Sequence, residues 1–425
     1  MQSVSAQYSI LRRVQEDGPW LLILLAMVLL PFRNAANAPM AVMAVIGGIM
    51  LIRNAKLILV DHRARLLFVL FGCIWLPMLI SLPTAVEPKH SLSTSLMFLR
   101  FPLAGVFVLS VLERPEARKR LTIATAALLG VWCVDGLIQW QAGRNLLGQP
   151  YDGHNLTGLF HPKRVIGLVV AALAPVCFEE IRRLVAGRSM WMCAASLVLA
   201  MPLVLVIALG GSRTSWMMGV MACASWGAYQ YWRSEWRYRH RLALLIILAG
   251  VVSVPLIARV PGMESRVNQT LQLLKGDLDA IDRATSGRVP IWTIALEMAR
   301  DYPLTGVGPR GFRYKYVDYA DSDTPYIAPD GESGAAHPHQ IVLEVATETG
   351  IIGLMGFAAF CVIIVRLLLD RNNVSAAPWI LAVLVAMFPL NAHMAIYGNF
   401  WAHVAWWTIL VMIGMMPRII EKESA

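Results

Sequence analysis

The chain has 425 residues, of which 57% are hydrophobic and only 15% are charged. Soluble globular proteins carry about a quarter charged residues, so this composition excludes an ordinary soluble domain and indicates a polytopic membrane protein. The formal net charge of +10 does not indicate nucleic-acid binding, because the basic residues gather in alternate short loops. That distribution is typical of membrane proteins, where it sets orientation.

Apolar segments of spanning length recur along the chain, and about 20 residues are needed to cross the hydrocarbon core. The predicted fold class is therefore all-α, with about twelve transmembrane helices. The predicted spans are 18–33, 38–53, 66–83, 92–112, 121–140, 165–181, 190–209, 214–232, 242–261, 340–365, 376–396 and 400–417. The first segment, preceded by Arg12 and Arg13, resembles a signal peptide. Because many spans follow, we expect an uncleaved first helix.

Lys and Arg residues are unevenly distributed between alternate loops. One set of loops holds basic clusters, as at 114–120 and 233–241, whereas the loops on the other side hold few basic residues. The positive-inside rule then predicts that both termini are cytoplasmic. Residues 1–261 hold nine predicted helices, 262–338 form an outer segment, and 339–425 hold three more helices. In a Gram-negative cell the outer segment lies in the periplasm.

The outer segment has its own helical pattern. Leucines and an isoleucine recur at helical spacing over 271–281, with charged residues between them, which predicts an amphipathic helix. A second helix is predicted over about 289–300, because Pro290 suits a first helical turn. A turn-rich stretch follows at 305–312. The acidic, Gly- and Pro-rich residues 318–335 are expected to form a loop.

No cofactor motif is visible in the sequence. It holds no HExxH, no DxD, no CxxC pair and no Gly-rich nucleotide loop between a strand and a helix, so no metal or nucleotide cofactor is predicted. The six cysteines lie in or beside apolar runs, and their spacing suits neither a zinc site nor a disulfide framework. We expect them to be small core residues. The remaining candidates are polar residues at the outer ends of spans.

His337 and His339 flank Pro338 at the border between the outer segment and the tenth predicted span. Imidazole titrates near neutral pH and can take a proton from a hydroxyl, so either histidine is a candidate general base. The alternative is a pair of interfacial histidines that bind lipid headgroups. Three acidic residues could assist or replace a histidine: Glu332, Glu344 and Glu348. For Glu344 a structural role is favoured.

Arg213 and Arg288 are candidates for binding a phosphate. Arg213 follows two glycines at the outer start of the eighth span, and Arg288 precedes the helix that begins near Pro290. A helix N-terminus adds partial positive charge and free N–H groups, which favours an anion beside each guanidinium. The alternatives are a snorkelling arginine that binds lipid headgroups and a solvated loop arginine.

Three further cations belong to the same outer loops. Lys163 and Arg164 follow His161-Pro162, and Arg310 lies in the turn-rich stretch. Each is a possible secondary phosphate ligand, and for each the alternative is a solvated or structural side chain.

Taken together, three stretches resemble the superfamily of O-antigen ligases, O-antigen polymerases and protein O-oligosaccharyltransferases of bacterial inner membranes. Gln340 stands where the family usually has Asn. The resemblance covers the topology and about 205–360, whereas the first half of the chain matches only in hydropathy. The stretches are Ser286-Gly287-Arg288-Val289-Pro290-Ile291-Trp292 with Asp301-Tyr302-Pro303-Leu304-Thr305-Gly306-Val307-Gly308; His337-Pro338-His339 with Leu343, Glu348, Gly350 and Gly353; and Gly211-Ser212-Arg213-Thr214-Ser215.

The resemblance implies a fold of the type C glycosyltransferase kind and a donor glycan on undecaprenyl pyrophosphate. In that mechanism Arg213 and Arg288 bind the pyrophosphate and stabilise the charge that develops on it. His339 activates the acceptor hydroxyl, because its spacing to Gly350 is similar to the family's pattern, and His337 shares that role or orients the acceptor. No metal or other cofactor is implied, and a single displacement inverts the anomeric carbon.

Within the superfamily we favour the ligase that joins O-antigen to lipid A–core, whose other partners are membrane lipids. Protein oligosaccharyltransferases are often longer, with domains after the last span, whereas only residues 421–425 follow here. An O-antigen polymerase shares the fold and is the nearest alternative. A lipid-linked glycan flippase is an alternative of another class. Against it, the polar candidates cluster on one face and no pair of broken helices suggests inverted repeats.

Overall fold

The computed structural model describes residues 18–185, 190–233, 287–321, 324–329, 331–389 and 394–418, together with positions 264, 268, 282 and 285. Within these residues the secondary structure is helical, apart from an isolated bridge between Arg144 and Pro150. The amphipathic helix predicted over 271–281 and the ninth span predicted over 242–261 lie outside the described residues.

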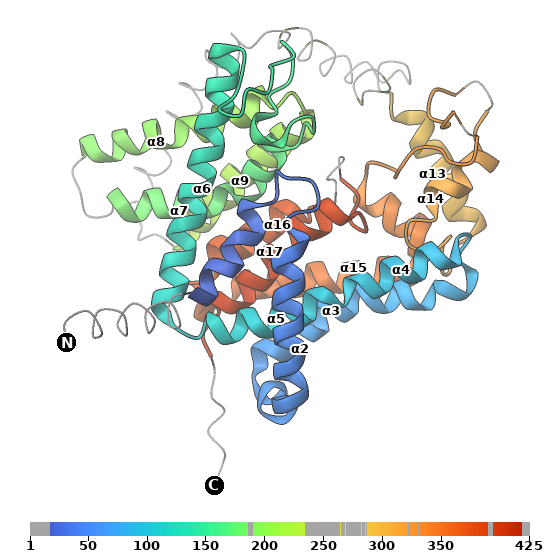
Figure 1. The fold of residues 1–425 in the computed structure, drawn as a ribbon, viewed down its shortest axis with the longest axis horizontal. Helices are drawn as coiled ribbons and strands as arrows, with labels where there is room; N and C mark the ends of the chain where they lie inside the picture. Colours follow the sequence, from blue (N-terminus) through green and yellow to red (C-terminus); the bar gives the residue numbers. More distant parts are fainter. Residues whose placement is uncertain are drawn as a thin grey trace, which may run out of the picture.

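The helices follow one another with short connections along most of the described chain (Figure 1). A helix at Gly18–Val28 comes first. The labelled helices are α2 (Asn37–Val60), α3 (His62–Ile80), α4 (Pro88–Phe98), α5 (Arg100–Val111), α6 (Pro115–Ala142), α7 (Ile166–Val185), α8 (Met190–Leu209), α9 (Arg213–Arg233), α13 (Val289–Asp301), α14 (Phe312–Lys315), α15 (Ile341–Leu369), α16 (Ala377–Ala386) and α17 (Asn399–Met415).

Five helical stretches of the described chain are long and apolar enough to cross a membrane. Shorter apolar helices accompany them, among them α16 and α17. The chain is thus a multi-pass membrane protein, and the total of about twelve spans remains a prediction from the sequence. The five long stretches are Asn37–Val60, His62–Thr84, Pro88–Val111, Pro115–Ala142 and Ile341–Leu369.

The core and the outer surface of the bundle are both apolar. Nearly every residue of α16 and α17 is buried, as expected for helices that are hydrophobic on all sides and lie at the centre of a bundle. By contrast, Val45 and Ile52 of α2 and Val220 of α9 are 64%, 85% and 69% exposed. A water-soluble protein rarely exposes so many large apolar residues, and a lipid environment accounts for them.

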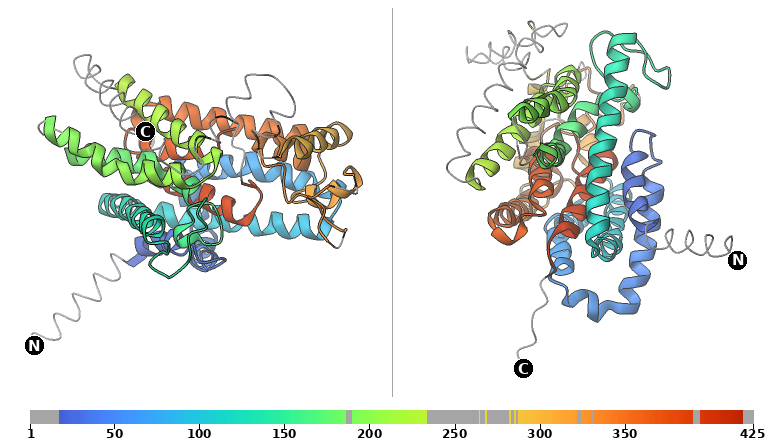
Figure 2. Two further views of the ribbon diagram at one scale, coloured as in Figure 1. Left: turned by 90° about the horizontal axis from the view of Figure 1, so that it is seen from above. Right: turned by 90° about the vertical axis from the view of Figure 1, so that its left-hand side faces the viewer.

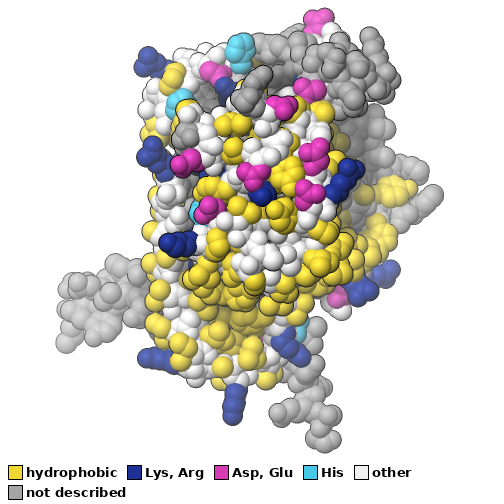
Figure 3. Space-filling model, turned by 90° about the vertical axis from the view of Figure 1, so that its right-hand side faces the viewer, with side chains coloured by type: hydrophobic (Ala, Val, Ile, Leu, Met, Phe, Trp, Pro, Cys, Tyr) yellow, Lys and Arg dark blue, Asp and Glu magenta, His cyan; other side chains and the backbone are white. Residues whose placement is uncertain are grey.

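Two groups of helices lie on either side of this centre. Helices α7, α8 and α9 pack against one another, and α3 runs alongside α15, as two further views of the bundle show (Figure 2). Helices α13 and α14 cover one end of α15. The face at this end carries acidic, basic and histidine side chains above a broad hydrophobic surface (Figure 3). Charged and histidine side chains therefore gather at the end of the molecule that α13 occupies (Figure 3).

The observed helices agree with the predicted ones in most places. The helix predicted over 289–300 is α13, with Pro290 in its first turn. The predicted span 92–112 is divided at Leu99 between α4 and α5, and the helix in the predicted span 376–396 ends at Ala386. Hydropathy reports the length of an apolar run, but it does not detect where packing interrupts a helix inside that run.

Candidate functional site

The two histidines lie against each other at the start of α15. Their ring centroids are 4.0 Å apart, and the His339 backbone N–H donates to His337 Nδ1 at 3.1 Å. His339 has a positive φ of 54°, in the left-handed region that costs a side-chain-bearing residue about 1–2 kcal/mol. This turn folds His339 back over its neighbour. His337 is buried, whereas His339 is partly exposed.

Gln340 forms the N-cap of α15. Its side-chain oxygen accepts from the Leu343 backbone N–H at 2.6 Å, and its amide nitrogen donates to the Pro389 carbonyl at 2.9 Å. An N-cap residue satisfies one of the N–H groups that a helix start leaves open. Gln340 thus fixes where α15 begins and attaches that point to the segment after α16. The residue that departs from the family pattern has a clear structural function here.

The loop after α13 is attached to α15 through a break in that helix. Gly350 has φ +64° and ψ −158°, so the carbonyls of Thr347 and Glu348 are turned out of the helical ladder. They accept instead from the backbone N–H groups of Val307 (2.8 Å) and Gly308 (3.0 Å). Gly350 must be glycine, because a Cβ there would lie 2.3 Å from the Leu304 carbonyl oxygen. The glycines in the quoted motifs therefore join the outer segment to a membrane helix.

Glu344 and Glu348 are fully buried and hold backbone groups. Glu344 accepts from the N–H groups of Ile396 (3.0 Å) and Tyr397 (3.3 Å), which bind α15 to the segment before α17. Glu348 accepts from the Arg310 N–H at 2.6 Å. The structural interpretation favoured for Glu344 agrees with these contacts. Glu332, the third acidic candidate, is exposed on the loop before the histidines.

Arg310 connects the turn-rich loop to the histidine segment. Its backbone has a positive φ of 63°, and its guanidinium Nη1 donates to the carbonyl of Ala336 at 3.3 Å. That carbonyl directly precedes His337 in the chain. These contacts give Arg310 a positioning role near the histidines, which its sequence context did not reveal.

Arg288 is connected to the histidines through α13. It is the N-cap residue of that helix, and Trp292, one turn later, donates from Nε1 to the Pro338 carbonyl at 3.0 Å. Residues four apart lie on the same face of a helix, so Arg288 is on the face that meets the histidine segment. Sequence reasoning missed this use of Trp292, although the residue belongs to the quoted motif.

Arg213 starts α9 and is close enough to Arg288 to repel its charge. Burial, together with repulsion from the Arg213 guanidinium, lowers the pKa of Arg288. Gly211, two residues before Arg213, is needed for packing, since a Cβ on it would lie 2.1 Å from Asn155 Oδ1. Gly211 thus allows a close approach of the chain to the loop before α7. Two arginines that are 75 positions apart in sequence are therefore close enough in the fold for their charges to repel each other.

Lys163 and Arg164 lie on the exposed loop before α7. Arg164 forms an ion pair with Asp152 at 3.3 Å, and Lys163 is 5.1 Å from the centroid of the Phe400 ring. Both side chains are exposed, and an exposed ion pair contributes little to stability. Within the part of the chain that the structure describes, no contact places either residue against the histidines, so their assignment to phosphate stays a prediction.

The assembled site joins an imidazole pair to a pair of repelling guanidinium groups. Arginines close to each other in a partly buried place favour a multiply charged anion such as a pyrophosphate. A neutral imidazole nearby can accept a proton from a hydroxyl. Within the described residues, no three His, Cys, Asp or Glu side chains come together in a group that could hold a metal ion.

The comparison with known families agrees with the resemblance noted in the sequence. Residues 194–358 match the family model described as O-Antigen ligase. The matched range covers less than half of the chain and includes Arg213, Arg288, His337 and His339, but neither Lys163 nor Arg164. Among curated proteins, no match was found.

Proposed function

Because residues 194–358 carry an O-antigen ligase domain, whose family acts as lipid-linked glycan transferases, we propose that this chain is an O-antigen ligase. It transfers a glycan from undecaprenyl pyrophosphate to a sugar hydroxyl of lipid A–core. The observation that carries this proposal is the convergence at one end of the bundle. Arg288 lies near Arg213, and one helical turn along α13 Trp292 contacts the segment that holds both histidines.

The two arginines bind the pyrophosphate of the donor. Burial and repulsion from Arg213 both lower the pKa of Arg288, and the repulsion is relieved when two phosphate groups lie between the guanidinium groups. The same contacts become stronger as the pyrophosphate gains charge on leaving the sugar, which is how fixed cations lower a barrier. Lys163, Arg164 and Arg310 remain secondary candidates for the same anion.

His339 acts as the general base, and the hydrogen bond between the two histidines supports this choice over His337. His337 Nδ1 accepts from the His339 N–H, so in the neutral ring the proton is on Nε2. In that tautomer the Nδ1 lone pair already accepts the backbone hydrogen bond and Nε2 carries the proton. His337 therefore has no lone pair left to accept a proton from the acceptor hydroxyl. His339 is also the more exposed of the two. His337 thus orients His339 or the acceptor.

The reaction is a single displacement. The acceptor oxygen forms a bond to the anomeric carbon, the bond from that carbon to the pyrophosphate oxygen breaks, and the hydroxyl proton passes to His339. The configuration at the anomeric carbon is inverted. Since the arginines supply positive charge, the reaction needs no metal. Transfer by purified protein is expected to survive thorough chelation, and a reversible loss rescued by a divalent cation would contradict this.

For the membrane arrangement we propose about twelve spans in a type C glycosyltransferase-like fold. Both termini are cytoplasmic, and the site faces the periplasm of a Gram-negative inner membrane. The positive-inside distribution of Lys and Arg supports this orientation. A cysteine-accessibility scan tests it: a cysteine placed at the exposed position 332 is expected to react with a membrane-impermeant thiol reagent added to intact spheroplasts.

One gel of a deletion strain tests the ligase assignment. A ligase deletion is expected to leave polymerised O-antigen on the carrier lipid and none on lipopolysaccharide. Single repeat units on lipopolysaccharide would instead identify a polymerase, and loss of glycan from a protein would identify a protein O-oligosaccharyltransferase. In proteoliposomes, movement of labelled lipid-linked glycan without covalent transfer would identify a flippase.

A further inference from the structure

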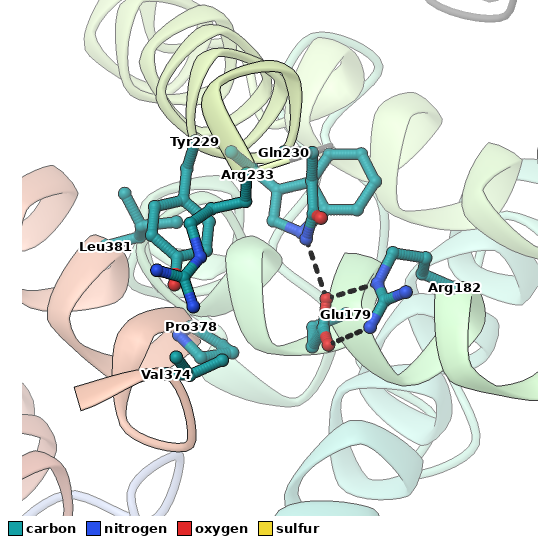
Figure 4. A pocket seen from close by; sticks show the side chains of 9 residues that line it. Glu179, Arg182, Tyr229, Gln230, Arg233, Val374, Pro378 and Leu381 are labelled. Atoms are coloured by element: carbon teal, nitrogen blue, oxygen red, sulfur yellow. Dashed lines mark hydrogen bonds and ion pairs between the residues drawn. The ribbon is translucent and has the colours of Figure 1, made fainter. Parts of the chain in front are cut away.

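A cavity of about 230 Å³ lies at the end of α9 opposite to Arg213. Helix α9 has 21 residues, so its two ends are about 30 Å apart, which equals the thickness of the hydrocarbon core. The cavity and Arg213 of the candidate active site therefore lie at opposite ends of α9, which corresponds to the predicted span 214–232. Helices α7, α9 and α16 with the turn before it form the walls (Figure 4): Glu179, Arg182, Trp226, Tyr229, Gln230, Arg233, Val374, Pro378 and Leu381.

A buried carboxylate organises one wall of this cavity. Glu179 is 7% exposed and accepts from Arg182 at Nε (2.8 Å) and Nη2 (2.7 Å). The Gln230 side chain donates to the same carboxylate at 2.9 Å, which joins α7 to α9. The bidentate pair neutralises both charges and holds Arg182 rigidly. Glu179 therefore has a structural role in this wall of the cavity.

Arg233 places a second guanidinium at the cavity. It lies over the rings of Tyr229 (6.0 Å) and Trp232 (5.9 Å), and in Figure 4 it extends from α9 toward Pro378. No carboxylate in the described part of the chain forms an ion pair with Arg233. Glu179 also accepts from Arg183 Nε at 3.2 Å. Among the side chains that line the cavity it is the one carboxylate beside two guanidinium groups, so the lining carries a net positive charge.

Trp226 adds a donor that the protein does not use. Its indole Nε1 is buried in the wall and has no hydrogen-bond acceptor among the described residues. A buried donor without an acceptor is rare and calls for one from outside the chain. The cavity therefore offers an anion two kinds of donor, the Arg233 guanidinium and the Trp226 N–H.

The opposite wall of the cavity is apolar. Val374, Pro378 and Leu381 come from α16 and the turn before it. A ligand of this cavity must therefore combine an anionic group with apolar surface, at the level of a membrane interface. Basic pockets between membrane helices commonly accept lipid headgroups. About 230 Å³ accommodates several groups the size of a water molecule, each of ~30 Å³, and so a phosphate with its glycerol.

We propose that this cavity is a binding site for the phosphate headgroup of an anionic phospholipid. The phosphate accepts from Arg233 and from Trp226 Nε1, and the glycerol and upper acyl chains lie against Val374, Pro378 and Leu381. The occupied leaflet is the one facing away from the candidate active site. Bound lipid joins α9 to α16, and α9 begins with Arg213, so occupancy stabilises the bundle that carries the site.

The test uses the purified full-length protein in detergent, titrated with dioctanoyl phosphatidylglycerol while thermal unfolding and native mass spectra are recorded. Phosphatidylglycerol is expected to raise Tm and to appear as a one-lipid adduct, whereas dioctanoyl phosphatidylcholine does neither. Arg233→Gln is expected to weaken the apparent affinity about tenfold, because a hydrogen bond to a charged group is lost. Trp226→Phe is expected to weaken the affinity about threefold, because it keeps an aromatic ring but removes the N–H donor.

Arg53→Gln is the matched control, because Arg53 is an exposed arginine of α2 that does not line the cavity. It is expected to bind phosphatidylglycerol as the unmodified protein does. An unchanged affinity in both Arg233→Gln and Trp226→Phe would overturn the site. Should Arg233→Gln not fold, Trp226→Phe decides alone. Inorganic phosphate that raises Tm and competes at the same concentration as the lipid would overturn the lipid assignment in favour of a free phosphate.

Discussion

Arginines at the two ends of the helical bundle differ in the charges that surround them. At the end near α13, Arg213 and Arg288 repel each other and the pKa of Arg288 is lowered. At the other end, the fully buried Arg63 donates to the Asp61 carboxylate at 2.7 Å and lies 3.5 Å from Glu113. Arg418 completes this network, 2.9 Å from Glu113.

The difference separates a structural use of charge from a functional one. Opposite charges at the Asp61 network neutralise each other and connect α3 with the loops after α5 and α17. Like charges brought together lower stability, and groups with strongly perturbed pKa values cluster at functional sites. Substitutions at the Arg63 end should therefore change stability, and substitutions at the Arg288 end should change activity.

The largest effect is expected for His339→Ala. Removal of a general base lowers the rate by about 10²–10⁴ in typical enzymes, and the transfer rate of labelled glycan should fall by that factor. Thermal unfolding should change little, because His339 is only partly buried. His337→Ala is the matched comparison and should cost less, since it removes only an orienting contact. A wild-type rate for His339→Ala would refute the assignment of the base.

Arg63→Ala should have the largest effect on stability. Breaking a buried ion pair costs about 3–5 kcal/mol, because it leaves the Asp61 carboxylate without its nearest cation. A lower Tm in detergent should show this loss, while the transfer rate per folded molecule is retained. Arg418→Ala, at a half-exposed member of the same network, should cost less than about 1 kcal/mol. An equal loss of stability in Arg63→Ala and Arg418→Ala would contradict the distinction between a buried and a half-exposed ion pair.

Arg288→Ala should lower the transfer rate by about 10²–10³, the usual cost of removing one donor to a developing anion. Stability should fall less than in Arg63→Ala, because removing Arg288 also removes its repulsion from Arg213. Arg288→Lys keeps the charge but loses the planar pair of donors, and it should recover the rate only in part. A large loss of stability with an unchanged transfer rate would show that Arg288, like Arg63, has a structural role.

Gly306→Ala should detach the loop after α13 from α15. A Cβ at Gly306 would lie 2.5 Å from the Thr347 carbonyl oxygen, and φ is +66°. Gly331→Ala is the control, since its φ is +72° but nothing lies within 4 Å. The control should cost about 1–2 kcal/mol from backbone strain alone. Gly306→Ala should cost more and should also lower activity, as measured by unfolding and by glycan transfer.

Gln340→Ala should give the smallest effect. Loss of the N-cap contact costs about 0.5–2 kcal/mol of stability. Gln340→Asn restores the residue usual in the family, and it should keep the cap but lose the longer reach to the Pro389 carbonyl. Thermal unfolding of both variants beside the unmodified chain measures the difference. A rate loss as large as that of His339→Ala would show that Gln340 acts in the reaction.

The sequence predicted the site residues as separate candidates. Polarity at the ends of apolar runs singled out Arg213, Arg288 and the histidines, and Pro290 marked the start of α13. The contacts that join them could not be predicted. Nothing in the pattern says that Trp292 donates to Pro338 or that Glu348 holds the Arg310 N–H, because both partners are far apart in sequence.

The sequence by itself determined the all-α membrane class, because long apolar runs can satisfy their backbone only as helices in lipid. It also determined which residue types could bind a phosphate and accept a proton. Tertiary structure alone decided that α9 and α13 bring Arg213 and Arg288 into one repelling environment. It also decided that Gly350 turns two carbonyls of α15 toward the outer loop. Packing sets such pairings, since hydropathy records the composition of each helix but not its neighbours.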